Sequence, residues 1–156
     1  MRGMRKINAG KLSKILKEHK RWIDDKEEGE KADLSNADLS GANLSRANLL
    51  CADLSAAILM DANMSEANLS RADLSAANLF SVGLMDANLS RADLIDASLS
   101  LADLSGANLT QVENLSIKQL SEARTLYKAK LDPELMEQVK DKYPHLLENP
   151  EYYEEE

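Results

Sequence analysis

Residues 32–51 read ADLSN ADLSG ANLSR ANLLC, and this five-residue pattern continues without a break to residue 109. An apolar residue stands at the centre of each of the sixteen repeats, at positions 34, 39 and every fifth position to 109. Fifteen of these central residues are Leu and one is Met64. The residue two places earlier is Ala in every repeat except at Val82. The residue between them is Asp or Asn except at Ile58, Gly83 and Ser98.

A period of five fits neither an α-helix nor a straight strand. Five residues advance an α-helix by about 500°, so successive leucines would point to every side of it. In a straight strand, an odd period would place alternate leucines on opposite faces. The pattern instead predicts a short extended segment, with Ala and Leu pointing inward and Asp or Asn outward. A two-residue corner then follows, for which Ser, Asn, Asp and Gly are suited.

These residues resemble the pentapeptide-repeat family, whose hallmark is Ala-(Asp/Asn)-Leu-Ser-X, and the resemblance covers residues 32–109. It implies a right-handed, four-sided coil of 20 residues per turn. Sixteen repeats then form about four coils, with strands about 4.8 Å apart. The fold class that we expect is therefore an all-β solenoid, a right-handed quadrilateral β-helix, capped by α-helices at both ends.

We predict caps because exposed coil ends and strand edges invite aggregation. Residues 1–31 should form an N-terminal capping helix with Asn8 as N-cap, and Gly29 should allow the turn into the repeats. We expect Trp22 and Ile23 of this helix to cover the first coil. The β-helix is predicted over residues 32–115.

Residues 116–148 should form a C-terminal helical cap, because two helix starts can be read there. Ser116 and Gln119 form a potential capping box, in front of a helix that places Leu120, Ala123 and Tyr127 on one face. Asp132 and Pro133 are the N-cap and first residue of a second helix, which Pro144 ends. Residues 149–156 are predicted to be an acidic, disordered tail.

The composition argues for a binding protein and against an enzyme. The 156 residues carry a net charge of −8, and residues 32–115 hold 11 acidic but 3 basic side chains, which argues against direct nucleic-acid binding. The histidines, His19 and His145, lie in different caps, and Cys51 is the single cysteine. We therefore expect no catalytic group, cofactor or metal site. The sequence shows no secretion signal or membrane span, which predicts a cytoplasmic protein.

Residues 20 apart should stack on one side of the coil. One side then carries an aspartate ladder, which consists of Asp33, Asp53, Asp73 and Asp93, and another carries Asn48, Asn68, Asn88 and Asn108. Carboxylates about 5 Å apart repel one another, so we expect raised pKa values in the aspartate ladder. Arg71 and Arg91 are its expected partners, and Arg46 and Glu66 should pair between coils. The ladder is either a solvated surface or a recognition surface for a basic partner.

The residue after each central Leu is Ser or Thr in eleven repeats, which makes the apolar exceptions informative. Met60 and Phe80 are 20 apart, Ile58 lies beside them, and Met85 is one corner away. Such an outward cluster calls for a cover. A second copy of the chain, a foreign protein or the chain's own terminal helices would each serve.

The predicted function is that of a rigid, non-enzymatic interaction or scaffold module. Its partner is another protein or a second copy of the chain, and the candidate contact residues are Asp33, Asp53, Asp73, Asp93, Ile58, Met60, Phe80 and Met85. The family resemblance implies an alternative. Some pentapeptide-repeat proteins resemble DNA in shape and charge, bind type II topoisomerases such as gyrase, and protect against quinolones.

Overall fold

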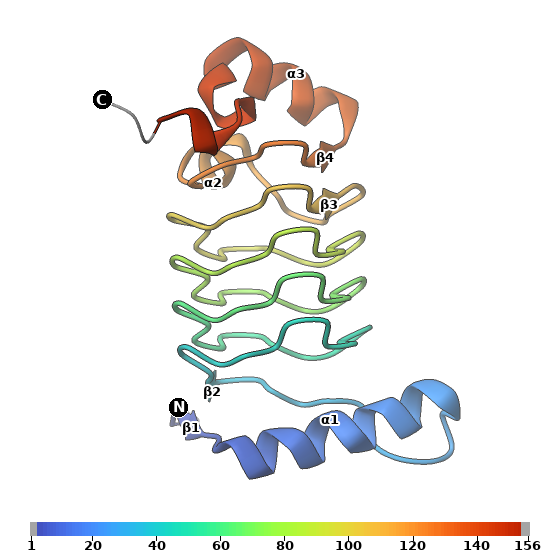
Figure 1. Cartoon of the computed structure of the whole chain (residues 1–156). Helices are drawn as coiled ribbons and strands as arrows, with labels where there is room; N and C mark the ends of the chain where they lie inside the picture. The colour runs from blue at the N-terminus through green and yellow to red at the C-terminus, as the bar shows by residue number, and fades with distance from the viewer. Residues whose placement is uncertain (1–2, 154–156) are drawn as a thin grey trace.

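The repeats form a stack of coils in a computed structural model that describes residues 3–153 (Figure 1). Parallel β-bridges join residues 20 positions apart, from Asp33 with Asp53 up to Asn88 with Asn108. Two backbone hydrogen bonds accompany each bridge. For example, Leu54 N–H donates to the Asp73 carbonyl (2.8 Å), and Asp73 N–H donates to the Ala52 carbonyl (3.0 Å). The chain therefore rises by one coil every 20 residues, as the family resemblance implies.

The interior is built from the repeat's Leu and Ala, which confirms the predicted inward positions. The central residues from Leu34 to Leu109 are at most 3% exposed. The repeat alanines are buried as well, apart from Ala42 and Ala47 of the first coil. Full burial of one such Leu contributes about 1.5–3 kcal/mol, so the stack is held together mainly by this apolar column.

The corners explain why the polar residues of the repeat recur. The second corner residue has a positive φ, as at Asn36 (54°) and Arg71 (57°), which is a strained region for side chains with a Cβ. The outward Asp or Asn supports the corner through its side-chain oxygen. At Asp53, Oδ1 accepts from Ser55 N–H (2.9 Å) and from Ser55 Oγ (2.6 Å). Asp or Asn followed two residues later by Ser is thus a corner-forming unit.

A short strand and a helix lie at the N-terminal end of the stack (Figure 1). Strand β1 (Arg5–Lys6) pairs in parallel with β2 (Ala37–Asp38). Helix α1 (Ala9–Asp24) follows, and the Asn8 side chain accepts from Lys11 N–H (2.9 Å), which confirms the predicted N-cap. Gly29 adopts φ 75°. Trp22 is predicted to cover the first coil, but it stacks on His19, and His19 is the fully buried residue of α1. Ile23 lies beside Ala47 and Asn48 of the first coil.

The coil path continues past residue 115, so the predicted boundary of the β-helix is wrong. Strand β3 (Asn108–Leu109) pairs with β4 (Lys130–Leu131), and Asp103 bridges Thr125. The spacing is 22 residues in this part, because the short helix α2 (Ile117–Ser121) is inserted. Its capping box is confirmed, but α2 ends before Ala123 and Tyr127.

Helix α3 (Pro133–Lys142) and two 3-10 turns, η1 (Pro144–Leu147) and η2 (Pro150–Tyr153), follow above the last coil (Figure 1). The predicted proline start is confirmed, although the Asp132 carboxylate accepts from Gln111 N–H (3.0 Å) instead of capping α3. Disorder is a wrong prediction for residues 150–153, which form η2, while residues 154–156 lie outside the described residues.

Candidate interaction surfaces

The aspartate ladder is aligned as predicted, but its electrostatics differ from the prediction. Parallel bridges join Asp33, Asp53, Asp73 and Asp93 in order. Asp33 Oδ1 accepts from the Ser35 hydroxyl (2.7 Å) and from Ser35 N–H and Arg5 Nη1 (3.0 Å each). These contacts, the Ser35 hydroxyl foremost, lower the pKa of Asp33. The expected rise is therefore wrong at Asp33, because donors within the corner stabilise the charged form.

The predicted neutralising arginines do not pair with the ladder. Arg91 Nε donates to Gln111 Oε1 (2.8 Å), and within residues 3–153 neither Arg71 nor Arg91 forms an ion pair. Asp93 Oδ1 instead accepts from Asn114 Nδ2 (2.9 Å). Both arginines, Asp73, Asp93 and Glu113 line one shallow depression.

Two other predicted contacts between coils are present. Arg46 donates through Nε and Nη2 to both carboxylate oxygens of Glu66 (3.1 and 3.2 Å). Asn68 Nδ2 donates to Asn48 Oδ1 (3.1 Å), one step of the predicted asparagine ladder. Both contacts are exposed, so each contributes little to stability.

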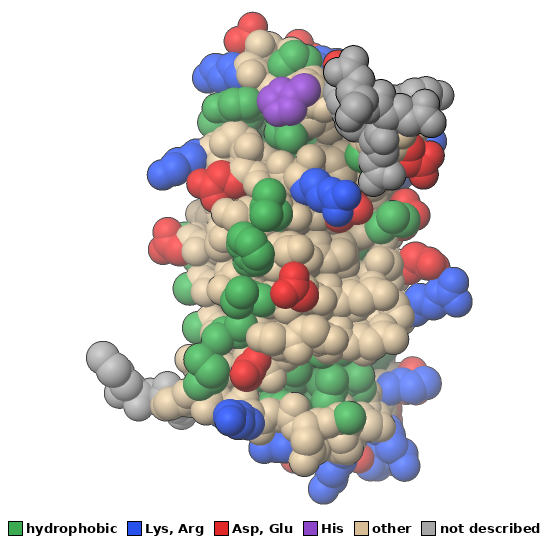
Figure 2. Space-filling view, turned by 60° about the vertical axis from the view of Figure 1, so that its left-hand side comes forward, with side chains coloured by type: hydrophobic (Ala, Val, Ile, Leu, Met, Phe, Trp, Pro, Cys, Tyr) green, Lys and Arg blue, Asp and Glu red, His purple; other side chains and the backbone are tan. Residues whose placement is uncertain are grey.

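An apolar ridge runs along one corner of the stack, and it is formed by Met60, Phe80 and Leu101. Asp61 N–H donates to the Phe80 carbonyl (3.1 Å) and Ser81 N–H to the Ser100 carbonyl (2.9 Å), so these corners lie directly above one another. Met60 is half-buried, whereas Phe80 is 37% and Leu101 53% exposed. Figure 2 shows hydrophobic side chains in a line along the stack. The terminal helices thus leave the ridge uncovered.

Sequence reasoning missed Leu101 because it searched the position after each central Leu. Leu101 occupies the next position, where most repeats carry a small or charged residue, and that contrast is the signal that was available. One side of the stack ends at the ridge corner. Ile95, which is 44% exposed, lies at the corner where this side begins. Bridges join the outward residues on that side in the order Asp38, Ile58, Asn78 and Ser98, of which the last three are uncharged.

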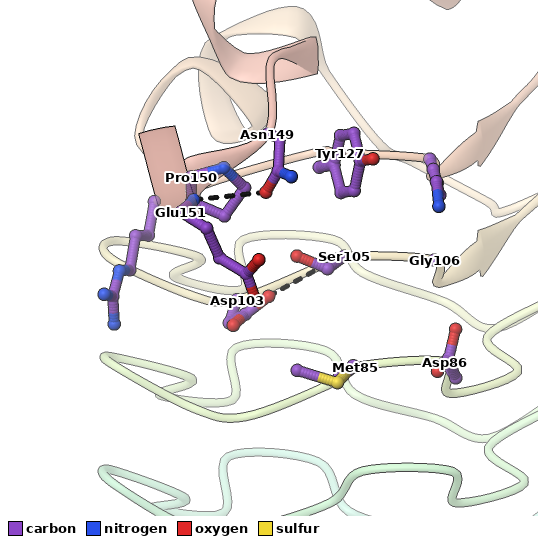
Figure 3. A pocket seen from close by; sticks show the side chains of 11 residues that line it. Met85, Asp86, Asp103, Ser105, Gly106, Tyr127, Asn149, Pro150 and Glu151 are labelled. Atoms are coloured by element: carbon purple, nitrogen blue, oxygen red, sulfur yellow. Dashed lines mark hydrogen bonds between the residues drawn. The ribbon is translucent and has the colours of Figure 1, made fainter. Parts of the chain in front are cut away.

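Met85 belongs to a different surface from Met60 and Phe80. It is 47% exposed and lines a hollow of about 540 Å³ beneath the C-terminal segment (Figure 3). Asp103 Oδ1 accepts from Ser105 N–H (3.0 Å), and Asn149 Oδ1 accepts from Glu151 N–H (3.1 Å) at its rim. The structure therefore does not bring all four predicted apolar residues together.

The described part of the chain offers few side chains that could form a metal or catalytic site. Among residues 3–153, no group of three or more His, Cys, Asp or Glu side chains is placed to hold a metal ion. The Cys51 side chain is partly exposed and forms no disulfide with the described residues. None of the helices in these residues has the length and apolar character needed to cross a membrane.

Comparison with known proteins identifies the repeat. A family model described as pentapeptide repeats (8 copies) matches residues 30–65, 57–82 and 84–113, which is more than half of the chain. The chain belongs to the pentapeptide-repeat family. Pentapeptide-repeat proteins fold as right-handed quadrilateral β-helices and generally act as structural or interaction modules.

Solved pentapeptide-repeat structures resemble this chain over part of their length. Rfr23 from the cyanobacterium Cyanothece is 44% identical over 62% of this chain, with a TM-score of 0.49. A protein from the Arabidopsis thaliana thylakoid lumen is 37% identical over 57% of this chain, with a TM-score of 0.55. The alignments cover 60% and 61% of those two chains, respectively.

A more distant similar structure is that of full-length QnrB1, a plasmid-mediated fluoroquinolone resistance protein. It is 15% identical over 75% of this chain and 74% of its own, with a TM-score of 0.32. At this distance the likeness does not bear on function. No curated protein matches the chain.

Proposed function

We propose that this pentapeptide-repeat protein is a rigid, non-enzymatic interaction module that binds another protein through the apolar ridge. The observation that supports this proposal is the exposure of Phe80 and Leu101, which lie in successive coils at the same corner of the stack. In this proposal about four coils form the rigid body. Helix α1 caps one end of it, and α2 and α3 cap the other.

The surroundings of the ridge suit a protein partner. The centre of a protein interface is depleted of charge and enriched in aromatic residues and Met. Phe80 and Met60 supply such side chains. On the neighbouring side, Ile58, Asn78 and Ser98 are uncharged, and the charged Asp38 lies one coil below Ile58. Fully burying a side chain such as Phe80 or Leu101 contributes about 1.5–3 kcal/mol. A partner would gain only the part that remains exposed, so several such contacts must act together.

The test compares the native chain with a Phe80→Ser, Leu101→Ser double variant. A matched control is Ser70→Ala, Ser90→Ala, which changes corner residues on another part of the stack. Light scattering gives the solution mass of each. If the native chain and the control are dimers and the ridge variant is a monomer, the partner is a second copy of the chain.

If all three proteins are monomers, a photo-crosslinking amino acid placed at Ser81 tests for a foreign partner in the native cell. The proposal predicts a discrete adduct at Ser81 that is lost in the ridge variant and absent when the crosslinker replaces Ser70. Monomers without such an adduct would contradict it. The proposed compartment is the cytoplasm, which cell fractionation tests.

A DNA-mimicking modulator of gyrase is the second candidate, and the aspartate ladder supports it. Asp53, Asp73 and Asp93 stack in register, and within residues 3–153 they form no ion pair. A basic DNA-binding groove would be attracted to such a row of charges. A supercoiling assay with and without a quinolone should show inhibition or protection that is lost when the three residues are changed to Asn. No effect of the native protein would remove this candidate.

A further inference from the structure

A groove lies at the N-terminal end of the stack, away from the apolar ridge. Two hollows of about 480 and 300 Å³ share Leu16 of α1. The first is lined also by Leu12, Ala42 and Asn43, and the second by Ala47 and Asn48. Together they form the N-terminal groove, which follows α1 along two adjoining sides of the first coil. Figure 2 shows a hydrophobic area between this end of the molecule and the repeats.

The groove exists because the N-terminal cap covers only part of the first coil. Ala32 and Ala37 are 1% and 0% exposed, since His19 contacts the first and β1 pairs with the second. The chain then enters α1 at Ala9 and leaves the coil edge. As a result, Ala42 and Ala47 are the repeat alanines that remain only partly buried.

The same gap leaves backbone groups of the first coil without partners. In the next coil, Asn63 N–H donates to the Ala42 carbonyl (2.9 Å), and the Asn63 carbonyl accepts from Leu44 N–H (2.7 Å). Asn43 and Asn48 occupy the equivalent positions with no coil below them. Within residues 3–153, their backbone N–H and carbonyl groups form no hydrogen bond. They therefore present an unpaired, parallel strand edge beside an apolar wall.

We propose that the N-terminal groove binds a peptide that adds to the first coil as two short parallel strands, one at Asn43 and one at Asn48, joined by a corner like the one at Ser45 and Arg46. Strand β1 already pairs in this way with Ala37 and Asp38 on the neighbouring side of the same coil. A peptide carbonyl accepts from Asn43 N–H, and a peptide N–H donates to the Asn43 carbonyl. This is recognition by strand addition, in which alternate side chains enter the apolar groove.

The groove also defines the chemistry of the peptide. Alternate residues must be apolar to contact Leu12 and Leu16, and the residues between them face solvent. The charged residues that line the groove are Asp38 and the ion pair of Lys20 with Asp24, so the solvent-facing positions need polar residues of no particular charge. A single peptide is favoured over a second stack of coils, because α1 lies across this end (Figure 1). The proposal does not depend on the apolar ridge.

The experiment titrates the isotope-labelled full chain with the synthetic peptide Ala-Asp-Leu-Ser-Glu-Ala-Asp-Leu and follows its NMR spectrum. Saturable shifts are expected at the Asn43 and Asn48 amides and at the methyls of Leu12 and Leu16. The same peptide N-methylated at both Leu residues lacks two backbone donors. It should bind about tenfold or more weakly, given the usual free energy of such hydrogen bonds.

Two protein variants locate the site on the same helix. Ser13→Trp fills the groove from an exposed position that lines it, and it should abolish the shifts at Asn43 and Asn48. Lys14→Trp places the same side chain at an exposed position outside the groove and should leave binding unchanged. Circular dichroism checks that both variants retain α1. The proposal fails if no saturable shift occurs at Asn43 and Asn48, if the N-methylated peptide binds equally well, or if Ser13→Trp has no effect.

Discussion

The contact between His19 and the first repeat makes a prediction about how α1 is held. The His19 side chain is fully buried, and its Nδ1 accepts from Ala32 N–H (3.0 Å). Its ring stacks on Trp22 with centroids 5.5 Å apart. Nε2 is buried without a hydrogen bond to the described residues. The hydrogen bond at Nδ1 therefore joins α1 to the start of the repeats.

Replacing His19 with Leu keeps an apolar side chain at this position but removes the acceptor. Ala32 N–H is then buried and unpaired, which costs about 1–3 kcal/mol. For a protein of this size, the melting temperature should fall by roughly 2–12 °C. In His19→Asn, Oδ1 can replace Nδ1 as acceptor. Amide exchange at Ala32 should therefore accelerate in the Leu variant and stay closer to the native rate in the Asn variant.

The same residue predicts a pH dependence. Burial lowers the pKa of His19 below its ordinary 6.5, with further lowering by Lys26 and Lys31, while the Leu50 backbone opposes the shift. The folded chain then holds His19 neutral at pH values where the unfolded chain already binds a proton. Stability should be full above about pH 6.5 and decrease as the pH falls below it, by up to about 1.4 kcal/mol per pH unit.

Melting curves between pH 7.5 and pH 5 measure this effect. His19→Leu should remove the pH dependence that is specific to His19, while the change His145→Asn, at an exposed histidine, should leave it intact. The argument is contradicted if the Leu variant is as stable as the native chain and keeps the same dependence on pH. It is also contradicted if Ala32 exchanges equally slowly in the Leu and Asn variants.

Three further substitutions test other parts of the fold by thermal or urea unfolding. Arg5→Ala removes an ion pair to Asp33 in which the two side chains are 33% and 57% exposed, so the free energy of unfolding should fall by less than about 1 kcal/mol. Amide exchange in β2 should become faster. Asp53→Ala removes the acceptor for Ser55 N–H and hydroxyl and should cost about 1–2 kcal/mol, whereas Asp53→Asn should cost much less; equal losses would contradict the proposed corner unit. Gly29→Ala should cost more than about 1 kcal/mol, because Gly29 has φ 75° and an added Cβ would meet Arg21 Cβ at 2.7 Å; an unchanged midpoint would contradict this.

The repeated part of the fold could be predicted in detail because each environment recurs every 20 residues. The inward Leu and Ala and the corners follow from the period of five, and the Arg46–Glu66 pair follows from the 20-residue coil that the family resemblance implies. The strict period of five also explains why the predicted end of the β-helix at residue 115 is wrong. Ala129, Lys130 and Leu131 repeat the Ala-x-Leu unit, but α2 shifts them by two positions, so a search at period five stops before them.

Other features depend on which of several nearby groups a side chain binds, and a sequence pattern does not specify this choice. Arg91 and Asp93 line the same depression, but Arg91 donates to Gln111 of the next coil. Strand β1 has two residues, which is too short for any periodicity. The N-terminal groove arises from what β1 and α1 leave uncovered, so it becomes visible only when the cap is placed on the coil.

The repeat restricts where a function can reside in this chain. Inward residues are fixed by packing at each coil, and the outward Asp or Asn with the following Ser is needed to form corners. A binding surface can therefore differ from the repeat only at sites where these two demands are relaxed. Phe80 replaces the usual Ser at its corner, and Leu101 replaces the usual small or charged residue. Asn43 and Asn48 lie at an edge with no coil below. A ridge variant and a groove variant should thus impair different interactions while leaving the coil intact, because neither touches the Leu and Ala interior.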